Sequence, residues 1–314
     1  MKISFPVLFL LACCVTGWSQ QVTPVFDVVP LGVKGGSDES NLSSYAVAVK
    51  GTADYICLDA GTINYGVQVA IKNGAFKGLP EDIIKTNIKG YLISHAHLDH
   101  VAGLVINSPD DSPKNIYGLS SCLEILKEKY FTWKNWANFT NEGEKPQLNK
   151  YHYVTLEAGN ETPLENTTMG VTAYSLSHVN PYESTAFLIG HNDSYLLYLG
   201  DTGADEIEKS DRLKELWKTV SPLVQTNKLR AIFIEVSFSN EQKENKLFGH
   251  LTPNLLMKEM KVLNNLSDLK NVSIVITHRK PSSDREEKIK KQLEELNSLK
   301  LKLVFPVQGK RILF

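Results

Sequence analysis

Residues 94–103 read SHAHLDHVAG, and three histidines and one aspartate fall within six consecutive positions of this run. The residues before it, KGYLI at 89–93, read as a buried strand. A chain that leaves a strand in this way can turn His95, His97, Asp99 and His100 towards one small volume. Neutral imidazoles and carboxylates are the ligands that Zn²⁺ takes in catalytic sites. The run therefore predicts a metal site rather than a chance cluster of polar residues in a surface loop.

The pattern His-x-His-x-Asp-His resembles the signature of the metallo-β-lactamase superfamily. Alone, this short motif fits lactamases, glyoxalases, lactonases and RNA-processing nucleases equally well. Residues 97–109, HLDHVAGLVINSP, resemble the longer signature of the class II 3′,5′-cyclic-nucleotide phosphodiesterases, which adds the Leu, the Gly, an aliphatic run and the Ser-Pro. The resemblance extends from roughly Phe26 to the C-terminus. It implies a single α/β domain, built as a four-layer α/β/β/α sandwich of two mixed sheets with the metals at one edge.

Length and charge agree with an enzyme that acts on a small molecule. The chain has 314 residues, a size at which α/β enzymes commonly form one domain. It carries 34 Lys and Arg against 35 Asp and Glu, so it has no excess of positive charge with which to bind a polyanion. A nucleic-acid partner is therefore disfavoured. A small anionic ligand is not excluded, because only the local field at its pocket matters.

Residues 1–20 are predicted to be a signal peptide, because a short positive start precedes an almost wholly apolar run at 3–15 and a small, polar stretch follows. The apolar run is too short for a spanning helix, although a retained membrane anchor is the alternative. We expect residues 21–314 to form an exported domain without a transmembrane segment, located in the periplasm or outside the cell. The run LLAC at 10–13 also resembles a bacterial lipoprotein box, which would leave Cys13 acylated and the protein anchored to the envelope.

Five strand-like runs each deliver a candidate functional residue at or just beyond the C-terminal end. Active sites of α/β folds gather at such strand ends. The runs and their residues are 89–93 before His95, 171–176 before His178, 195–199 before Asp201, 231–234 before Glu235 and 272–276 before His278.

The family resemblance implies two metal ions, Zn²⁺ or another divalent cation. The implied ligands are His95, His97 and His178 for one ion and Asp99, His100 and His278 for the other, with Asp201 as the bridge. The alternatives are satisfied core histidines at 178 and 278 and a turn-capping aspartate at 201. The order of these residues along the chain argues against those alternatives.

A second pair is implied by the segments IEVS at 234–237 and GHLTP at 249–253, which also resemble the phosphodiesterases. In that family setting, Glu235 would orient His250, and His250 would contact the phosphate or protonate the leaving oxygen. The alternative is that His250 stabilises the start of a helix capped by Thr252. His250, Glu235 and Asp99 are the candidate catalytic residues, with Asp99 serving as a metal ligand as well.

The expected reaction is hydrolysis of a 3′,5′-cyclic nucleotide, cAMP or cGMP, to a nucleoside 5′-monophosphate. Two Zn²⁺ ions would neutralise the anionic substrate and lower the pKa of a shared water, which gives a hydroxide that attacks phosphorus. His250 would then protonate the departing 3′ oxygen. Two other functions compete: a hydrolase of the same fold that acts on a lactam, lactone or thioester, and a zinc-binding envelope protein without turnover. Asp201 and the Glu235/His250 pair argue against the last.

Four features stay open in the sequence. Asp59, after the paired strands 43–50 and 54–58, either supports the metal site or caps a turn. Residues 110–150 read as an insertion-like stretch, and the aromatic run 131–139 within it is either a packed flap or a wall that contacts the purine. Cys57 and Cys122 could form a disulfide in an oxidising compartment. The protein could also form a homodimer.

Overall fold

The structure is a computed structural model that describes residues 1, 23–282 and 284–314. Beyond Met1, the predicted signal peptide lies outside these residues, and so does the lipoprotein-like Cys13. Within the described residues, fourteen strands form two sheets of seven. In spatial order, the first sheet contains β14 (Ile312–Leu313), β1 (Phe26–Gly32), β2 (Ser44–Val49), β3 (Tyr55–Leu58), β4 (Ile88–Leu92), β5 (Lys114–Gly118) and β6 (Tyr151–Thr155). The second contains β13 (Lys302–Val304), β12 (Ser273–Thr277), β11 (Leu229–Glu235), β10 (Ser194–Leu199), β9 (Glu183–His191), β8 (Gly170–Ser177) and β7 (Glu161–Pro163).

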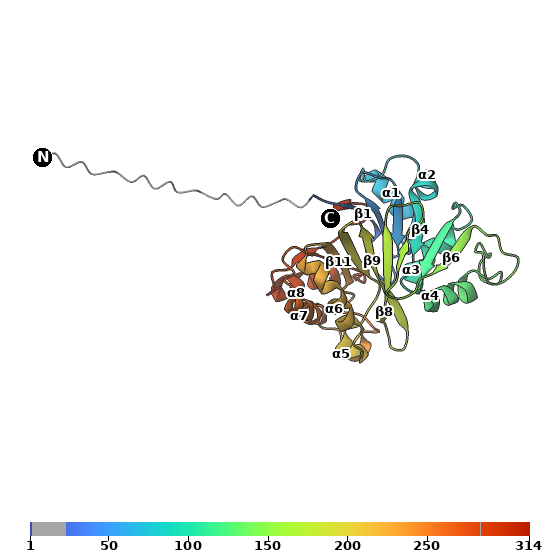
Figure 1. Cartoon of the computed structure of the whole chain (residues 1–314). Helices are drawn as coiled ribbons and strands as arrows, with labels where there is room; N and C mark the ends of the chain where they lie inside the picture. Colours follow the sequence, from blue (N-terminus) through green and yellow to red (C-terminus); the bar gives the residue numbers. More distant parts are fainter. Residues whose placement is uncertain (2–22, 283) are drawn as a thin grey trace.

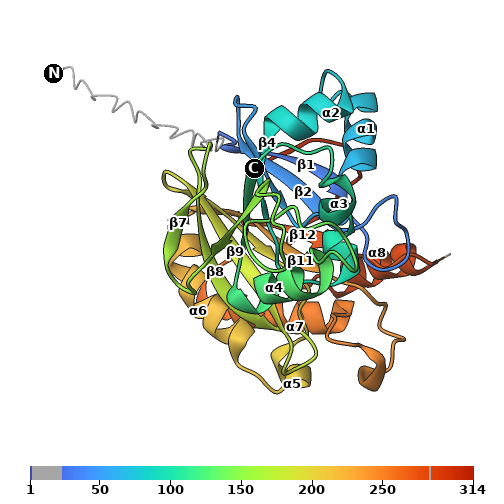
Figure 2. The ribbon, with the colours of Figure 1, turned by 90° about the vertical axis from the view of Figure 1, so that its right-hand side faces the viewer.

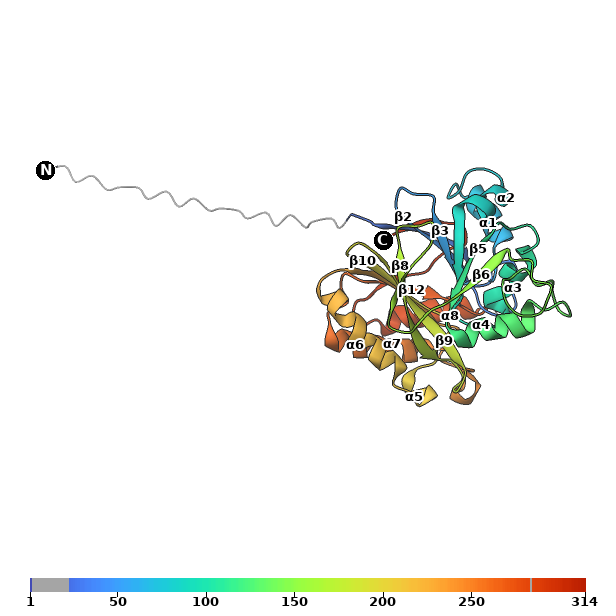
Figure 3. The same cartoon turned by 45° about the vertical axis from the view of Figure 1, so that its right-hand side comes forward.

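Helices cover the outer face of each sheet (Figure 1). The helical segments beside the first sheet are α1 (Asn64–Lys72), α2 (Pro80–Asp82), the π-helical turn η1 (Ile83–Asn87), α3 (Leu98–Asn107), α4 (Ser120–Ile125) and its π-helical continuation η2 (Leu126–Tyr130). Those beside the second sheet are α5 (Asp205–Glu208), α6 (Arg212–Gln225), the 3₁₀ turn η3 (Glu244–Lys246), α7 (Pro253–Leu266) and α8 (Arg285–Leu296). Views turned by 90° and 45° show the two sheets packed between these helical layers (Figures 2 and 3).

The four layers follow from the alternation of apolar side chains along the strands. In β1, Val28 packs into the core between the sheets, whereas Val29 packs under the helices of the first sheet. In β11, Phe233 enters the same central core, and Ile232 packs against the helices of the second sheet. Because successive side chains of a strand point to opposite faces, a strand that is apolar at every position must be covered on both sides. The predicted α/β/β/α sandwich is confirmed.

The strand directions bring the candidate residues to one edge. Strands β3 to β6 run parallel, as do β10 to β13, and β8 shares the direction of β10 because both are antiparallel to β9. The C-terminal ends of β3, β4, β8, β10, β11 and β12 therefore face one another where the two sheets meet. Because the candidate residues follow strands in the sequence, this edge is where they were expected to gather.

The stretch 110–150 is not wholly an insertion, and that interpretation was wrong for its first part. Residues 114–118 form β5, an inner strand of the first sheet, and β6 follows directly at Tyr151. The sequence KNIYG conceals this strand, because its lysine is charged and yet buried. The Nζ of Lys114 lies 2.7 Å from Oδ1 of Asp111, which compensates the charge.

Asp111 links three strands of the first sheet. Its Oδ2 accepts hydrogen bonds from the hydroxyls of Tyr91 in β4 and Tyr151 in β6, each at 2.7 Å, while Oδ1 pairs with Lys114 in β5. All four side chains are buried. Removing one partner of such a network leaves uncompensated polar groups in the core.

We therefore expect Asp111→Ala to lower the free energy of unfolding by about 3–5 kcal/mol, because it leaves the Lys114 ammonium buried without a carboxylate. Urea unfolding of the purified variant measures the effect. Asp110→Ala is the matched control, since Asp110 is the exposed neighbour in sequence and should change stability by less than about 0.5 kcal/mol. Equal stability of the two variants would contradict the structural role of Asp111.

The fold answers one open question of the sequence. Cys57 and Cys122 are both buried free thiols, so they form no disulfide. Burial raises the pKa of the Cys57 thiol to about 12, and it also raises the pKa of Cys122. In the part of the chain that the structure describes, no helix combines the length and apolar character that crossing a membrane requires.

Candidate metal centre

The metal motif occupies the turn between β4 and α3. His95 lies in the loop after β4, His97 is the residue before the first turn of α3, and Asp99 and His100 lie within that turn. Gly103 allows α3 to approach the loop after β3, because a Cβ at this position would lie 2.7 Å from the carbonyl oxygen of Ala60. The helix start thus holds the ligand-type side chains against the sheet edge.

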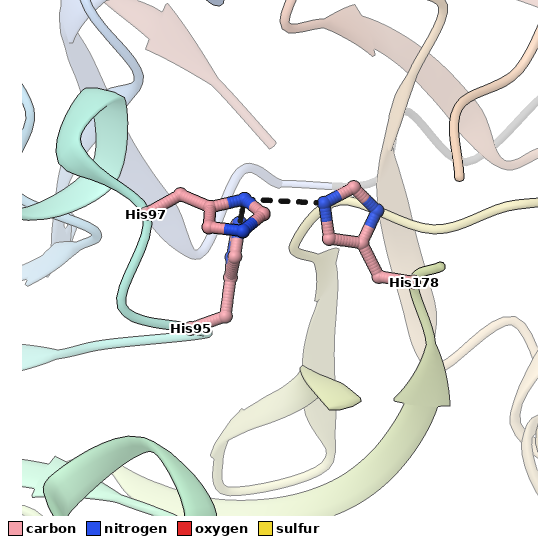
Figure 4. Close-up of side chains that lie close together, drawn as sticks. All are labelled: His95, His97 and His178. Atoms are coloured by element: carbon pink, nitrogen blue, oxygen red, sulfur yellow. Dashed lines mark hydrogen bonds between the residues drawn. The ribbon is translucent and has the colours of Figure 1, made fainter. Parts of the chain in front are cut away.

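Three imidazoles from two sheets converge at one point (Figure 4). Nδ1 of His97 lies 3.1 Å from Nε2 of His95 and 3.3 Å from Nε2 of His178. His178 follows β8 in the second sheet, so the group spans the junction of the sheets. The close approach of three ring nitrogens fits a cation that accepts their lone pairs.

A second group lies beside the first. Nε2 of His278 is 3.1 Å from Oδ2 of Asp99, and His100 completes a set whose ligand atoms lie within 4.8 Å of one another. Asp201, from the loop after β10, lies between the two groups. Its Oδ2 is 3.2 Å from Nε2 of His278 and 3.3 Å from Nε2 of His100, and 3.8 and 3.9 Å from Nε2 of His95 and His178, respectively. The structure thus brings all seven predicted ligand residues together, in the predicted two groups with Asp201 between them.

Hydrogen bonds on the outer ring nitrogens set the orientation of four of these imidazoles. In each ring Nδ1 faces a fixed acceptor, which leaves Nε2 with its lone pair directed into the centre, as ligating histidines require. The Nδ1 partners are Ser94 Oγ for His95 at 3.0 Å, Asp59 Oδ2 for His100 at 2.7 Å, the Gly249 carbonyl for His178 at 2.8 Å and Ser237 Oγ for His278 at 2.9 Å.

The donor set fits divalent cations. Nε2 of His100 is buried and has no hydrogen-bond partner among the described residues, which is the condition expected of a nitrogen whose partner is a metal. Burial, reinforced by neighbouring rings, holds the pKa of His95 well below its usual value. Burial also lowers the pKa of His178 to about 4. These two rings are therefore neutral at pH 7 and able to ligate a metal.

The carboxylates of the centre are ionised. Burial opposes the charge of Asp201, but His278 and His100 outweigh it and hold the pKa of Asp201 well below its usual value. Burial likewise opposes the charge of Asp99, and the hydrogen bond from His278 lowers its pKa despite this. The centre thus offers two anionic side chains alongside its imidazoles.

Glu235 and His250 form a pair at the side of this centre. Oε1 of Glu235 accepts a hydrogen bond of 2.7 Å from Nδ1 of His250, and both side chains are buried. Burial disfavours a charged ring, but Glu235 and then Asp201 raise the pKa of His250 above its usual value. Thr252 does cap α7 by accepting from the Leu255 amide, whereas His250 contacts the centre instead of the helix start. The hydrogen bond to Glu235 gives the His250 ring a fixed orientation.

Asp59 supports the metal motif. Its Oδ1 accepts from the Ser94 amide at 2.7 Å, and its Oδ2 accepts from the Ser94 hydroxyl, Nδ1 of His100 and the Tyr198 hydroxyl at 2.8, 2.7 and 2.6 Å. Of the two interpretations that the sequence left open, the supporting role is the one the contacts show.

We expect Asp59→Asn to weaken metal binding by about 10–100-fold, because the amide cannot accept from every donor that the carboxylate now satisfies and the His100 ring loses its fixed orientation. Competition with a chromogenic chelator measures the affinity. Asp54→Asn serves as the control, since Asp54 precedes β3 and pairs with Lys89 at the surface. Unchanged metal affinity in Asp59→Asn would show that the hydrogen bonds to Asp59 do not tune the centre.

Several contacts of the centre had no signal in the sequence. Ser237 donates from its hydroxyl to Oε2 of Glu235 at 2.7 Å while facing Nδ1 of His278. The ring of Tyr182 stacks on His97, with centroids 5.0 Å apart and planes at 13°. The Tyr182 hydroxyl also accepts from the Ala96 amide at 3.4 Å. In the sequence, the one hint of these contacts is the hydroxyl residue Ser237, two positions after Glu235.

The aromatic stretch 131–139 behaves as a packed flap. Phe131 is fully buried in the core of the first sheet. The indole nitrogens of Trp133 and Trp136 donate to the Pro146 carbonyl at 2.8 Å and to Oγ of Ser108 at 3.0 Å. These contacts fasten the flap to the rest of the domain, which favours the first of the two interpretations.

Comparisons with known proteins agree with the site. The family model described as class II cAMP phosphodiesterases matches residues 26–307. A 3′,5′-cyclic-nucleotide phosphodiesterase of Aliivibrio fischeri is 44% identical over 307 residues, which cover 92% of this chain and 93% of that protein. Unliganded yeast PDE1 shares the fold with a TM-score of 0.82 at 22% identity, covering 93% of this chain and 100% of that one. The Bacillus subtilis metallo-β-lactamase fold protein YhfI follows with a TM-score of 0.61 at 15% identity, covering 91% and 99%. The chain therefore belongs to the class II cAMP phosphodiesterase family.

Proposed function

We propose that this enzyme hydrolyses both cAMP and cGMP to nucleoside 5′-monophosphates with the help of two divalent cations, Zn²⁺ in the first instance. The observation that supports this proposal is the presence of two neighbouring groups of ligand-type side chains. One group has three imidazoles, the other has two imidazoles and a carboxylate, and Asp201 lies between them. His95, His97 and His178 would hold one cation and Asp99, His100 and His278 the other. When bound, the cations supply charge neutralisation of the phosphodiester and a water of lowered pKa.

The residues of the chain would perform the remaining steps. Asp59, Ser94, Ser237 and the Gly249 carbonyl fix the imidazoles before substrate arrives, so no reorganisation is needed during the reaction. Nδ1 of His250 is held by Glu235, which leaves Nε2 to carry a proton towards the departing 3′ oxygen of the ribose. As the oxygen of a water molecule bonds to phosphorus, the P–O3′ bond breaks, and O3′ takes the proton from His250 to become the 3′ hydroxyl.

The test is an assay of the purified protein with cAMP and with cGMP, before and after removal of metal by a chelator. We expect release of the 5′-monophosphate from both substrates, loss of activity after chelation, and recovery when Zn²⁺ is added back. Hydrolysis of a chromogenic cephalosporin without any release of nucleoside monophosphate would overturn the proposal, and so would activity that survives complete removal of metal.

We further propose that the protein is exported, as a periplasmic, extracellular or lipid-anchored form. The support is the sequence of residues 1–20 alone. Fractionation of cells that express the full chain tests this, with metabolic labelling by palmitate to detect acylation at Cys13. Retention of uncleaved protein in the cytoplasm would contradict export.

A further inference from the structure

The metal centre opens to solvent beside His97, which is exposed, and Asp99, which is half-buried. Leu98, between His97 and Asp99 in the metal motif, is 65% exposed, and two further apolar side chains are exposed on the second-sheet segments that carry residues of the centre. Val179 directly follows His178 and is 48% exposed, and Phe248 lies two residues before His250 and is 64% exposed. A single exposed apolar residue is ordinary on a protein surface. Here Val179 and Phe248 lie on two segments that both carry residues of the centre, His178 and His250.

Both residues have an unusual backbone. Val179 has a φ of 56° and Phe248 a φ of 52°, in the left-handed region that favours glycine. A β-branched or bulky residue in this region is a real outlier, because its side chain crowds the backbone. Strained residues of this kind concentrate at ligand-binding sites, where the surrounding structure holds them.

The two residues are held side by side by the joint between their segments. The Gly249 carbonyl accepts from Nδ1 of His178 at 2.8 Å. Gly249 packs so closely that a Cβ there would lie 2.5 Å from the Val179 amide nitrogen and 2.9 Å from its Cγ2. The Val179 carbonyl also accepts from the Tyr182 amide at 3.0 Å. Val179 therefore packs against the residue next to Phe248, and the same hydrogen bond that orients His178 fixes this surface.

We propose that Val179 and Phe248 form the surface on which the nucleobase of the substrate packs. This inference rests on the proposed function, because it takes the phosphate of a cyclic nucleotide to bind at the metal centre. The base is then one sugar ring away from the cations and needs a flat, apolar partner. An aromatic ring with an adjacent aliphatic side chain provides one, since stacking depends on the face of the base and not on its hydrogen-bonding groups. Of the other exposed candidates, Leu98 offers no aromatic ring, and the indole nitrogens of Trp133 and Trp136, within the flap, are held by the Pro146 carbonyl and the Ser108 hydroxyl.

The proposal is tested by measuring how tightly the Zn²⁺-loaded full chain binds 5′-AMP and ribose 5-phosphate, using isothermal titration calorimetry. The two probes differ only in the base, so their ratio of affinities isolates its contribution. We expect Phe248→Ala to weaken 5′-AMP binding by about tenfold, the lower part of the range for loss of one base–aromatic stack, and to change ribose 5-phosphate binding by less than about twofold. Val179→Gly should act in the same direction and to a smaller extent. Leu79→Ala, an exposed apolar residue just before α2, should leave both affinities unchanged.

Equal effects of Phe248→Ala on the two probes would overturn the proposal, because they would place Phe248 in the phosphate-binding machinery. Wild-type affinity of both variants for 5′-AMP would overturn it as well. The proposed function is judged separately by turnover of the wild-type protein. If the wild-type protein binds 5′-AMP through this surface but hydrolyses neither cyclic nucleotide, the proposed function is wrong and the base-binding surface is supported. If the wild-type protein hydrolyses cyclic nucleotides and both variants bind 5′-AMP normally, the proposed function is supported and the base-binding surface is wrong.

Discussion

Replacing His250 by alanine should lower kcat for cAMP by about 10²–10⁴-fold while both metal positions remain filled. The Glu235 carboxylate holds Nδ1 of His250 at 2.7 Å, and the ring also stacks on His278 with centroids 5.2 Å apart, so its orientation is fixed from two sides. A departing alkoxide without a proton donor is a poor leaving group. The effect should therefore fall on kcat, and metal content measured by inductively coupled plasma mass spectrometry should match wild type.

The metal measurement makes this prediction informative, because His250 also lies within reach of ligand atoms of the centre. Nδ1 of His250 is 3.7 Å from Oδ2 of Asp201, and His250 belongs to sets that could hold a cation together with His178 or His278. Loss of one metal equivalent in His250→Ala would identify the residue as a ligand. Full activity with full metal content would remove any catalytic role. His191→Ala, at a half-buried histidine that ends β9 and lies outside the centre, controls for the loss of an imidazole.

Asp201→Asn should reduce turnover by a factor on the order of 10³ or more, because it removes a carboxylate oxygen that lies within 4 Å of nitrogens in both ligand groups. Metals stabilise the charge of a phosphoryl transition state by several kcal/mol, and each 1.36 kcal/mol corresponds to about tenfold in rate. An amide is neutral and cannot bridge two cations. We expect the metal content to fall from two equivalents to one or fewer, in parallel with activity.

Asp193→Asn provides the matched control for this variant. Asp193 lies in the β9–β10 turn and pairs with Lys228 at the surface, an interaction of little energetic value. Its removal should leave metal content and turnover unchanged. Two full metal equivalents in Asp201→Asn, with activity near wild type, would show that Asp201 does not join the two groups.

The sequence could predict that the candidate ligand residues lie together, because these residues follow strands. His178, Asp201 and His278 are far apart in the chain, yet each comes directly after a run of buried residues, and parallel strand ends meet at one edge. Strands that are apolar at every position are covered on both faces, whereas strands that alternate apolar and polar residues face solvent on one side. Those two patterns are sufficient for the layers of the fold and for the location of the site.

Other features of the fold and the site could not be predicted, because they depend on tertiary contacts that leave no pattern in the local sequence. The role of Asp59 follows from the contacts that Ser94, His100 and Tyr198 make with its carboxylate. Tyr198 is 139 residues away in the sequence, so no local pattern reveals this contact. Strand β5 was hidden by a charged residue whose partner sits just before the strand. Positive φ values at Val179 and Phe248 cannot be read from valine and phenylalanine, because these residues usually avoid that region. Such strain is imposed by tertiary structure and becomes visible only there.

The proposed reaction needs a pair of cations at the centre, and titration of metal into metal-free protein measures whether both are required. The protein is stripped with a chelator, Zn²⁺ is added in known amounts, and cAMP hydrolysis is followed alongside bound zinc. We predict no turnover in the metal-free protein and activity that reaches its maximum at two equivalents per chain. Saturation at one equivalent, or turnover with none, would contradict the dinuclear centre.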